Sequence, residues 1–278
     1  MNDHLKNKVI IVTGAASGFG RLVSQKAAAR GARLVCADVN GEELSSTVEM
    51  IAANQGSVVG QVTDVTDLAA FNSLARTAME KFGCIDVLVN NAGIMPLGFF
   101  SDHARAAVAW DRCIDVNIKG VLHGILAVHD QMIAQGRGHI VNLSSIYGNF
   151  PVAGAAVYGA TKAAVNFLSE SLRVESQGKI KVTTIRPTGV PLTGLGSGVV
   201  NPVAIIGILG QNAGEYLPEM QAFAAGTLPR EKTDPESPQY AALHPEFLAD
   251  QIVYAIDQPW GVSIGDITVR ATGDRYIL

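Results

Sequence analysis

The residues whose types and spacing most clearly suggest catalysis are a tyrosine and a lysine in the stretch VYGATK, residues 157–162. Tyr158 and Lys162 are four positions apart, about one helical turn, so both side chains would project from the same side of a helix. A nearby ammonium group favours the ionised form of a phenol, whose pKa is ordinarily about 10. The pair could therefore act as a general acid/base, but the same spacing also occurs in solvated surface pairs.

A glycine-rich segment, TGAASGFG at residues 13–20, follows an apolar run and leads into a helical pattern. Gly14, Gly18 and Gly20 allow a tight turn and let backbone N–H groups approach a pyrophosphate at a helix N-terminus. Because the glycines stand between a strand and a helix, the segment predicts a dinucleotide-binding loop rather than an ordinary turn.

Polar residues also follow the next three strand-like runs. Asp38 can accept hydrogen bonds from ribose hydroxyls and would repel a 2′-phosphate. Ala16 and Ser17 in the glycine loop supply no cation for that phosphate, which favours NAD over NADP. Asp64 in TDV could accept from an adenine amino group or simply form a turn. Gly93 in NNAG would permit a close backbone approach.

Alternating strand and helix patterns would position these groups. The expected strands are Val9–Thr13, Arg33–Asp38, Ser57–Thr63, Ile85–Asn90, His139–Ser144, Lys181–Arg186 and Gly265–Arg270, and the expected helices include Phe19–Arg30, Glu42–Ala53, Leu68–Phe82 and Phe247–Ile256. The alternation predicts a single doubly wound α/β domain of the Rossmann type over residues 1–278, with a mainly parallel seven-stranded sheet. Ligands of such sheets lie beyond the carboxyl ends of the strands, where the segments above are expected.

As a set, these motifs resemble those of the short-chain dehydrogenase/reductase family. The matching segments are TGAASGFG, NNAG, DVNIKG with Asn117, VNLSS at 141–145 and YGATK at 158–162, in the family's order over residues 8–190. The resemblance implies a catalytic tetrad of Asn117, Ser145, Tyr158 and Lys162. Ser145 is preferred to Ser144 because it stands thirteen residues before Tyr158, the family's usual separation.

The resemblance implies an NAD-dependent oxidoreductase that interconverts a secondary alcohol and its ketone by hydride transfer. Tyr158 would move the proton at the oxygen, and Lys162 would lower its pKa and bond the nicotinamide ribose. Ser145 would orient the substrate oxygen, and Asn117 would hold a water linked to Lys162. The expected cofactor contacts are Gly14, Ser17, Gly18, Phe19, Gly20, Asp38, Asp64, Val65, Asn91, Ala92, Gly93, Tyr158, Lys162 and Val190.

One segment, RPTGVPLTG at 186–194, departs from the family's pattern. Thr188 stands where a glycine is usual, and Leu192 stands where a threonine is usual, with Thr193 one residue later. A backbone contact from Val190 to the nicotinamide carboxamide is still expected, whereas the threonine contact is not.

An irregular segment from about residue 190 to about 245 carries scattered glycines and prolines among apolar residues. The resemblance places it over the substrate as a lid, and its apolar character favours a hydrophobic secondary alcohol or ketone. The same residues could instead only pack the segment down or join a subunit interface. No Arg or Lys occurs from Val190 through Thr227, so an anionic substrate lacks a clamp there.

Composition narrows the remaining classes. The net charge of −4 without a basic block argues against nucleic-acid binding. Cys36, Cys84 and Cys113 are widely spaced and the histidines lack metal-ligand spacing, so neither a disulfide framework nor a metal site is expected. The N-terminal apolar run is too short for a signal peptide or a membrane span. A cytoplasmic location without a membrane partner fits best.

Three other interpretations remain open: an NADP-dependent carbonyl reductase, a nucleotide-sugar epimerase or dehydratase, and a non-catalytic dinucleotide-sensing module. The lack of a separate C-terminal substrate domain disfavours the epimerase, and an intact tetrad disfavours the sensor. By analogy with the family, we expect a homo-oligomer, a dimer or more often a tetramer, paired through helices near residues 110–132 and 158–176.

Overall fold

Parallel strands form the centre of the molecule. The computed structural model describes residues 3–277, so residues 1, 2 and 278 of the predicted domain lie outside the described range. Within that range, seven strands form one sheet in the order β3-β2-β1-β4-β5-β6-β7, and every neighbouring pair is parallel. The strands are β1 Val9–Thr13, β2 Arg33–Asp38, β3 Ser57–Val62, β4 Val87–Asn90, β5 Gly138–Leu143, β6 Ile180–Pro187 and β7 Asp266–Val269. The predicted Rossmann-type α/β fold is confirmed.

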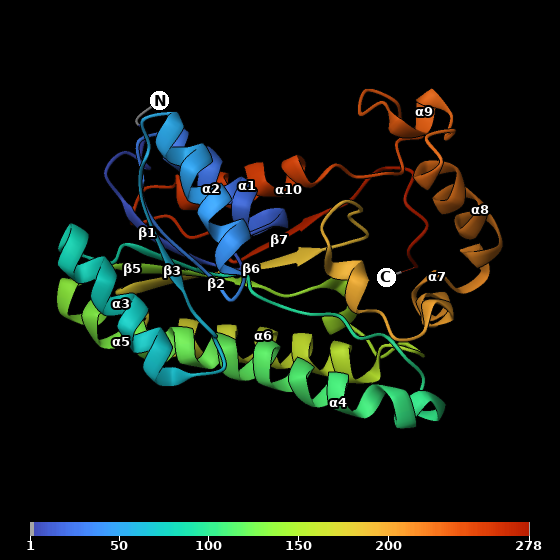
Figure 1. Ribbon diagram of the computed structural model, residues 1–278, viewed down its shortest axis with the longest axis horizontal. Helices are drawn as coiled ribbons and strands as arrows, with labels where there is room; N and C mark the ends of the chain where they lie inside the picture. Colours follow the sequence, from blue (N-terminus) through green and yellow to red (C-terminus); the bar gives the residue numbers. More distant parts are fainter. Residues whose placement is uncertain (1–2, 278) are drawn as a thin grey trace.

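Helices cover both faces of the sheet (Figure 1). One layer contains α1 Gly18–Ala29, α2 Gly41–Ala53 and α10 Pro245–Ile256, and the other contains α3 Leu68–Phe82, α5 Gly120–Gln135 and α6 Ala156–Glu175. Ile10 and Val12 of β1 pack in the first layer, whereas Val9 and Ile11 pack in the second. Burial on both faces explains why these strands are continuous apolar runs instead of alternating ones.

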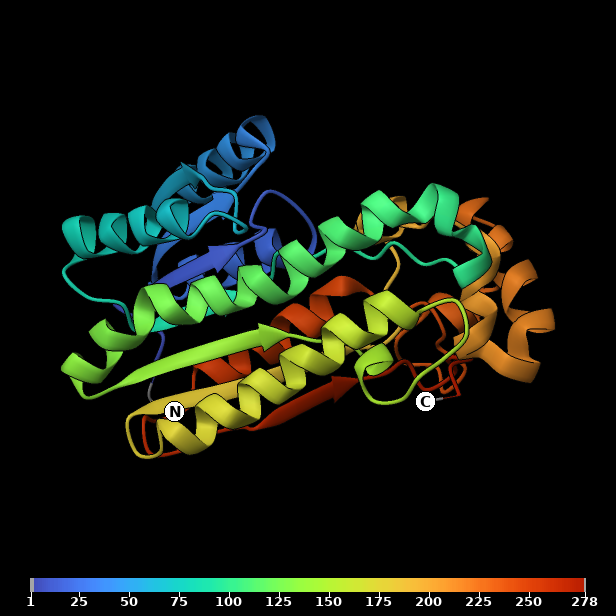
Figure 2. The ribbon, with the colours of Figure 1, turned by 90° about the horizontal axis from the view of Figure 1, so that it is seen from below.

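Two long helical segments run along the second layer. Helix α4 (His103–Ile114), a π-helical turn over Asp115–Lys119 and helix α5 follow one another directly. Figure 2 shows this continuous rod beside α6, with both extending past the strands towards the lid. The middle of the rod and the first two turns of α6 therefore lie at the carboxyl edge of the sheet.

Several predicted bounds need correction by one or two residues. Strand β4 begins at Val87 and not at Ile85, because the side-chain oxygen of Gln135 takes the N–H of Ile85 at 3.0 Å. The other shifts fall at element ends, where capping and turn bonds replace the regular ladder: α1 begins at Gly18, α2 at Gly41 and α10 at Pro245, and β3, β5, β6 and β7 begin or end one residue away from the predicted position.

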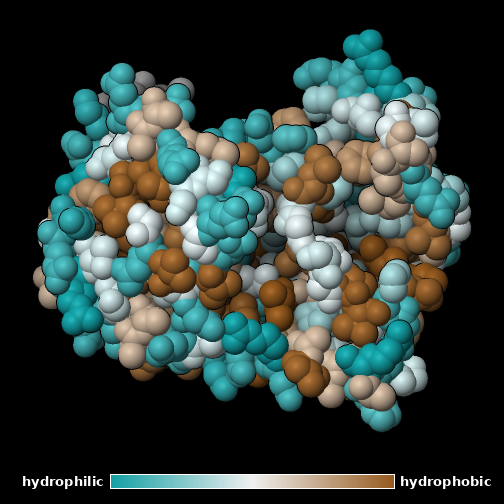
Figure 3. Space-filling view, in the orientation of Figure 1, coloured by the Kyte–Doolittle hydropathy of each residue, from teal (hydrophilic) through white to brown (hydrophobic). Residues whose placement is uncertain are grey.

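The segment between residues 190 and 244 contains short helices and no strand. These helices are α7 Ile206–Leu209, α8 Ala213–Ala224 and α9 Arg230–Thr233. They lie at one end of the molecule, beyond the carboxyl ends of the strands (Figure 1). On the face seen in Figure 3, a hollow separates the lobe of α8 and α9 from the rest of the molecule. We call residues 190–244 the lid segment.

Candidate active site

The glycine loop after β1 has the geometry of an anion cradle. Gly14 and Gly18 have φ values of 66° and 51°, a region that favours glycine. A Cβ atom on Gly20 would collide with the carbonyl oxygen of Gly14, so only glycine lets α1 pack this closely on the loop. Ser17 caps α1 without a side-chain hydrogen bond, which leaves the first N–H groups, including that of Phe19, without a side-chain partner. Such a helix N-terminus suits a phosphate.

The NNAG segment after β4 is fastened to this loop. The Asn91 side-chain amide donates to the carbonyl oxygens of Thr13 and Gly14 at 2.8 and 3.1 Å. The N–H groups of Asn91 and Ala92 both point at the Thr13 hydroxyl, at 3.1 and 3.2 Å. Asn91 therefore holds the shape of the glycine loop. Its hydrogen bonds join the segments that follow the neighbouring strands β1 and β4.

Asp38 lies at the end of β2, beside the glycine loop. Its carboxylate accepts from the N–H groups of Ala16 and Asn40, both at 3.0 Å. The loop residues themselves supply no cation, but the Arg21 guanidinium folds back from α1 onto the carbonyl of Ala16. Arg21 also pairs with Glu43 at 2.6 Å, so its charge is compensated.

Asp64 and Val65 follow β3 on the same edge. One Asp64 oxygen accepts from the N–H and the hydroxyl of Thr66, and the other accepts from Arg112 at 3.1 Å. These hydrogen bonds lower the pKa of Asp64, against the opposing effect of partial burial. The carbonyl of Val65 meets the His123 ring at 2.9 Å. The side chain of Asp64 is thus fixed in its orientation.

The four tetrad residues come together beneath the lid segment. Tyr158 and Lys162 project from α6, Ser145 follows β5, and Asn117 lies in the π-helical turn. The exposed fractions of Tyr158, Lys162, Ser145 and Asn117 are 3%, 5%, 6% and 0%. The Lys162 ammonium lies 5.8 Å from the centre of the Tyr158 ring and donates to the carbonyl of Leu143 at 2.8 Å. A solvated surface pair is therefore excluded for Tyr158 and Lys162.

The Asn117 side chain is tied to the segment after NNAG. Its oxygen accepts from the N–H of Ile94 at 3.0 Å, and its nitrogen donates to the carbonyl of Ile94 at 2.9 Å. The same nitrogen lies 3.1 Å from the Thr161 hydroxyl of α6. Asn117 therefore clamps the chain after β4 against α6, and a π turn at this position is typical of functional sites.

Burial shifts the pKa values of Tyr158 and Lys162 in opposite directions. It raises the pKa of Tyr158 well above its usual value, while the hydrogen bond with Ser145 acts to lower it. Burial lowers the pKa of Lys162 to about 8, and interaction with Cys113 acts to raise it. Both effects follow from the cost of holding a charge away from water.

Gly93 connects the glycine-loop edge with the tetrad. A Cβ atom on Gly93 would lie 3.2 Å from the Asn117 side-chain oxygen and 3.5 Å from the Lys162 ammonium. The backbone of the NNAG segment thus borders both groups. A dinucleotide that begins at the glycine loop would reach the tetrad along this edge.

The unusual segment after β6 also meets the glycine loop. The Thr188 hydroxyl donates to the carbonyl of Val269 at 3.2 Å, so its visible contact is with β7. Thr193 lies over Gly18, where an added Cβ would come within 3.3 Å of the Thr193 carbonyl. The Thr193 hydroxyl donates to the carbonyl of Val190 at 3.3 Å. Thr193 and not Leu192 therefore faces the loop.

Sequence reasoning missed a contribution from the C-terminal segment. The ring of Tyr276 occupies the space over Gly189, where any Cβ atom would collide with the phenol. Hydrogen bonds from the N–H of Ile277 to the carbonyl of Ile208, and from Asn212 to the carbonyl of Arg275, fasten the segment to the lid. A single tyrosine so far along the chain gives no local signal, because only folding brings it to the end of β6.

Comparison with known proteins identifies the class. The family model described as short chain dehydrogenase matches residues 8–201. An uncharacterized oxidoreductase from Listeria monocytogenes is 37% identical over 275 residues, covering 98% of this chain and 99% of the relative. A short chain dehydrogenase/reductase from Burkholderia phymatum, solved in complex with NAD, is 30% identical with a TM-score of 0.75, covering 96% of this chain and 90% of its own.

An alcohol dehydrogenase from the archaeon Thermococcus sibiricus, complexed with 5-hydroxy-NADP, shares the fold at 20% identity and a TM-score of 0.77, covering 97% of this chain and 99% of its own. The chain therefore belongs to the short-chain dehydrogenase/reductase family and is an oxidoreductase of that family. Its structural neighbours bind dinucleotides of both the NAD and the NADP type.

Proposed function

We propose that the protein is an NAD-dependent oxidoreductase that interconverts a secondary alcohol and its ketone. The observation that carries the proposal is the buried group of Ser145, Tyr158 and Lys162 at the carboxyl edge of the sheet, bordered by Gly93 and facing the glycine loop. Hydride transfer to or from a carbonyl carbon requires a proton to move at the oxygen, and a buried phenol beside an ammonium suits that task.

Each side chain has a distinct part in the proposed reaction. Tyr158 exchanges the proton with the substrate oxygen, and Ser145, which lies beside it, donates a hydrogen bond that orients that oxygen. The Lys162 ammonium favours the ionised phenol in a site that excludes water. Bound NAD would supply the hydride acceptor and a positive ring whose charge also favours the phenolate.

In this proposal Asn117 mainly positions other parts of the site. Its side chain is occupied by the main chain of Ile94 and by Thr161. The water that Asn117 is proposed to hold for Lys162 would therefore have to bind beside these contacts.

NAD is the cofactor that the glycine-loop edge suits best. The free N–H groups at the start of α1 fit a pyrophosphate, and the Asp38 carboxylate would accept from a ribose while repelling a 2′-phosphate. Arg21 is the guanidinium that reaches this loop, but Glu43 already compensates its charge. An NADP-dependent carbonyl reductase remains the second candidate because Arg21 contacts the carbonyl of Ala16.

The substrate is proposed to be a largely hydrophobic alcohol or ketone held under the lid segment. Apolar lid residues, among them Ile208 and Leu209, pack in the same cluster as Tyr147 and Tyr158. That cluster places hydrocarbon around the reacting phenol, which suits an apolar carbon frame.

Spectroscopy tests this function directly. The full chain is mixed with NAD or NADP and a panel of secondary alcohols graded in size, and the absorbance of the reduced cofactor is followed. Reduction of NAD by at least one alcohol supports the proposal. Tight NAD binding without turnover of any alcohol or ketone would instead indicate a dinucleotide-sensing module.

We also propose a homo-oligomer in the cytoplasm. Large apolar side chains are exposed along both helices, Leu122 and Leu126 on α5 and Phe167 and Val174 on α6, and an exposed apolar patch favours an interface. Sedimentation of Phe167→Glu should show a smaller assembly than the parent protein.

The proposed cytoplasmic location agrees with the three free cysteines, which suit a reducing compartment. Separately, no helix within residues 3–277 is long and apolar enough to cross a membrane.

A further inference from the structure

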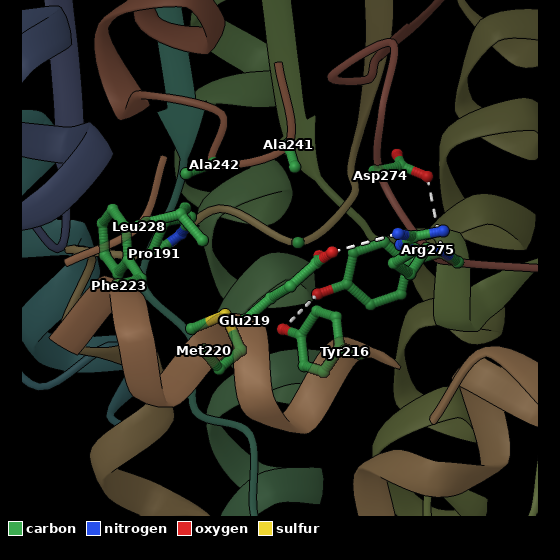
Figure 4. Close-up of a pocket in the computed structure, with 12 residues that line it drawn as sticks. Pro191, Tyr216, Glu219, Met220, Phe223, Leu228, Ala241, Ala242, Asp274 and Arg275 are labelled. Carbon is green, nitrogen blue, oxygen red and sulfur yellow. Dashed lines mark hydrogen bonds and ion pairs between the residues drawn. The ribbon is translucent and has the colours of Figure 1, made fainter. Parts of the chain in front are cut away.

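A small cavity lies between the lid segment, the C-terminal segment and the end of β6 (Figure 4). Apolar side chains such as Met220, Phe223 and Leu228 form part of its wall. Two phenols also line it, Tyr216 from α8 and Tyr276 from the C-terminal segment. The charged side chains Glu219, Asp274 and Arg275 line it as well, so the cavity has an apolar wall and a polar wall.

The two phenols have more hydrogen-bonding capacity than they use. Their hydroxyl oxygens are 2.9 Å apart, and the rings meet edge to face with centroids 5.8 Å apart. Each phenol carries one proton, so when one hydroxyl donates to the other, the second proton needs a further acceptor. No such acceptor is found among residues 3–277. Both phenols are half-buried at the cavity wall, so the spare donor is open to an oxygen of a ligand that enters the cavity.

The phenols continue the row of aromatic rings that starts at the reacting tyrosine. Tyr147 packs edge to face on Tyr158, with ring centroids 5.5 Å apart. Tyr216 and Tyr276 pack against the apolar cluster that contains Tyr147 and Tyr158. Tyr276 lies on Gly189, directly before Val190. The hydroxyl pair and the reacting phenol therefore border the same apolar cluster, over which a substrate held at Tyr158 would extend.

The charges beside the cavity are already balanced. Arg275 pairs with Glu215 at 2.8 Å and with Glu219 at 3.0 Å, and Lys232 also contacts Glu219. A carboxylate or phosphate on a ligand would have to displace these acidic partners. An uncharged oxygen needs only the spare hydroxyl proton.

We propose that Tyr216 and Tyr276, with Tyr147 beside them, form a polar subsite that donates a hydrogen bond to a second, uncharged oxygen of the substrate. The inference rests on the proposed function and narrows its substrate class. The preferred substrates are secondary alcohols or ketones that carry an additional hydroxyl or carbonyl oxygen on an otherwise apolar frame. Tyr216 and Tyr276 are then specificity-determining residues.

The test compares matched pairs of substrates. Each pair consists of a simple secondary alcohol and its analogue with one more hydroxyl, for example cyclohexanol and its vicinal diol, and the readout is the ratio of their kcat/KM values. In each pair that the parent protein turns over, kcat/KM should be higher for the member with the additional hydroxyl. Tyr276→Phe and Tyr216→Phe should lower that ratio about tenfold, the effect expected for one lost hydrogen bond.

A matched control separates the subsite from general effects of removing a phenol. Tyr254→Phe removes an exposed hydroxyl on α10 and should leave the ratio unchanged. The subsite would be overturned if Tyr276→Phe still turned over substrate with an unchanged ratio of kcat/KM values. This includes the case in which kcat/KM rises equally for both members of a pair. Either result would leave the proposed function standing. No turnover of any pair, with NAD or NADP, would reject the proposed reaction and the subsite with it.

Discussion

The glycine-loop edge and the lid side of the site are built in different ways. At the glycine-loop edge, polar side chains are held by nearby backbone, as Asn91 is by Thr13 and Gly14. On the lid side, the hydroxyl groups of Tyr216 and Tyr276 bond each other and keep spare hydrogen-bonding capacity. A dinucleotide has a constant shape that rigid backbone can match, whereas adaptable side chains suit a variable substrate.

Tyr158→Phe should break the reacting side alone and give the largest effect. Loss of the phenol proton removes general acid/base catalysis, so kcat should fall about a hundredfold to ten-thousandfold. NAD affinity, measured by fluorescence titration, should change little because the glycine loop is untouched. Tyr254→Phe is the control for a general effect of losing a tyrosine hydroxyl. Substantial turnover by Tyr158→Phe would contradict the assigned role.

Asp38→Asn should alter the other side of the comparison. The amide keeps an oxygen for the N–H of Ala16 but removes the charge that would repel a 2′-phosphate. The ratio of kcat/KM with NAD to that with NADP should fall about tenfold to a hundredfold. Glu42→Gln, at the start of α2, is a control for charge alone. A parent protein that already prefers NADP would refute the role proposed for Asp38.

Asn117→Ala should loosen the joint between the two sides. It leaves the N–H and carbonyl groups of Ile94 without their partners, which should lower the free energy of unfolding by about 1–3 kcal/mol. Chemical denaturation measures the change. Asn54→Ala, which removes an exposed side-chain bond, should cost less than about 0.5 kcal/mol. Equal losses in the two variants would argue against the clamp.

The pH profile of ketone reduction should report Lys162 and give the mildest effect. The pKa of Lys162 is lowered to about 8, so its ammonium loses the proton as the pH rises through that value. Tyr158 keeps its proton over the same range because burial raises its pKa. The value of kcat/KM should therefore be constant below about pH 8 and fall about tenfold per pH unit above it. In Lys162→Arg the guanidinium stays charged over this pH range, so kcat/KM should not fall above pH 8.

The sheet and the glycine-loop edge were predictable because their chemistry lies in short contiguous segments. TGAASGFG needs only a strand before it and a helix after it, and Ser145, Tyr158 and Lys162 follow from fixed spacing. Tyr276 could not be found this way, because only the fold brings it to Gly189. Arg21 is the residue after TGAASGFG, but its contact with the loop depends on a side-chain conformation that the motif does not specify. The short lid helices were also missed, since glycine and proline hide a regular period.

The contact between Tyr276 and Gly189 has a consequence for the evolution of new activities. After β7 the C-terminal segment makes no strand pairing in the described part of the chain, yet it reaches the wall of the cavity. Substitutions there would alter the proposed subsite without disturbing the strand pairing of the sheet. Related proteins can thus diverge in preference by changing a few residues of one terminal segment.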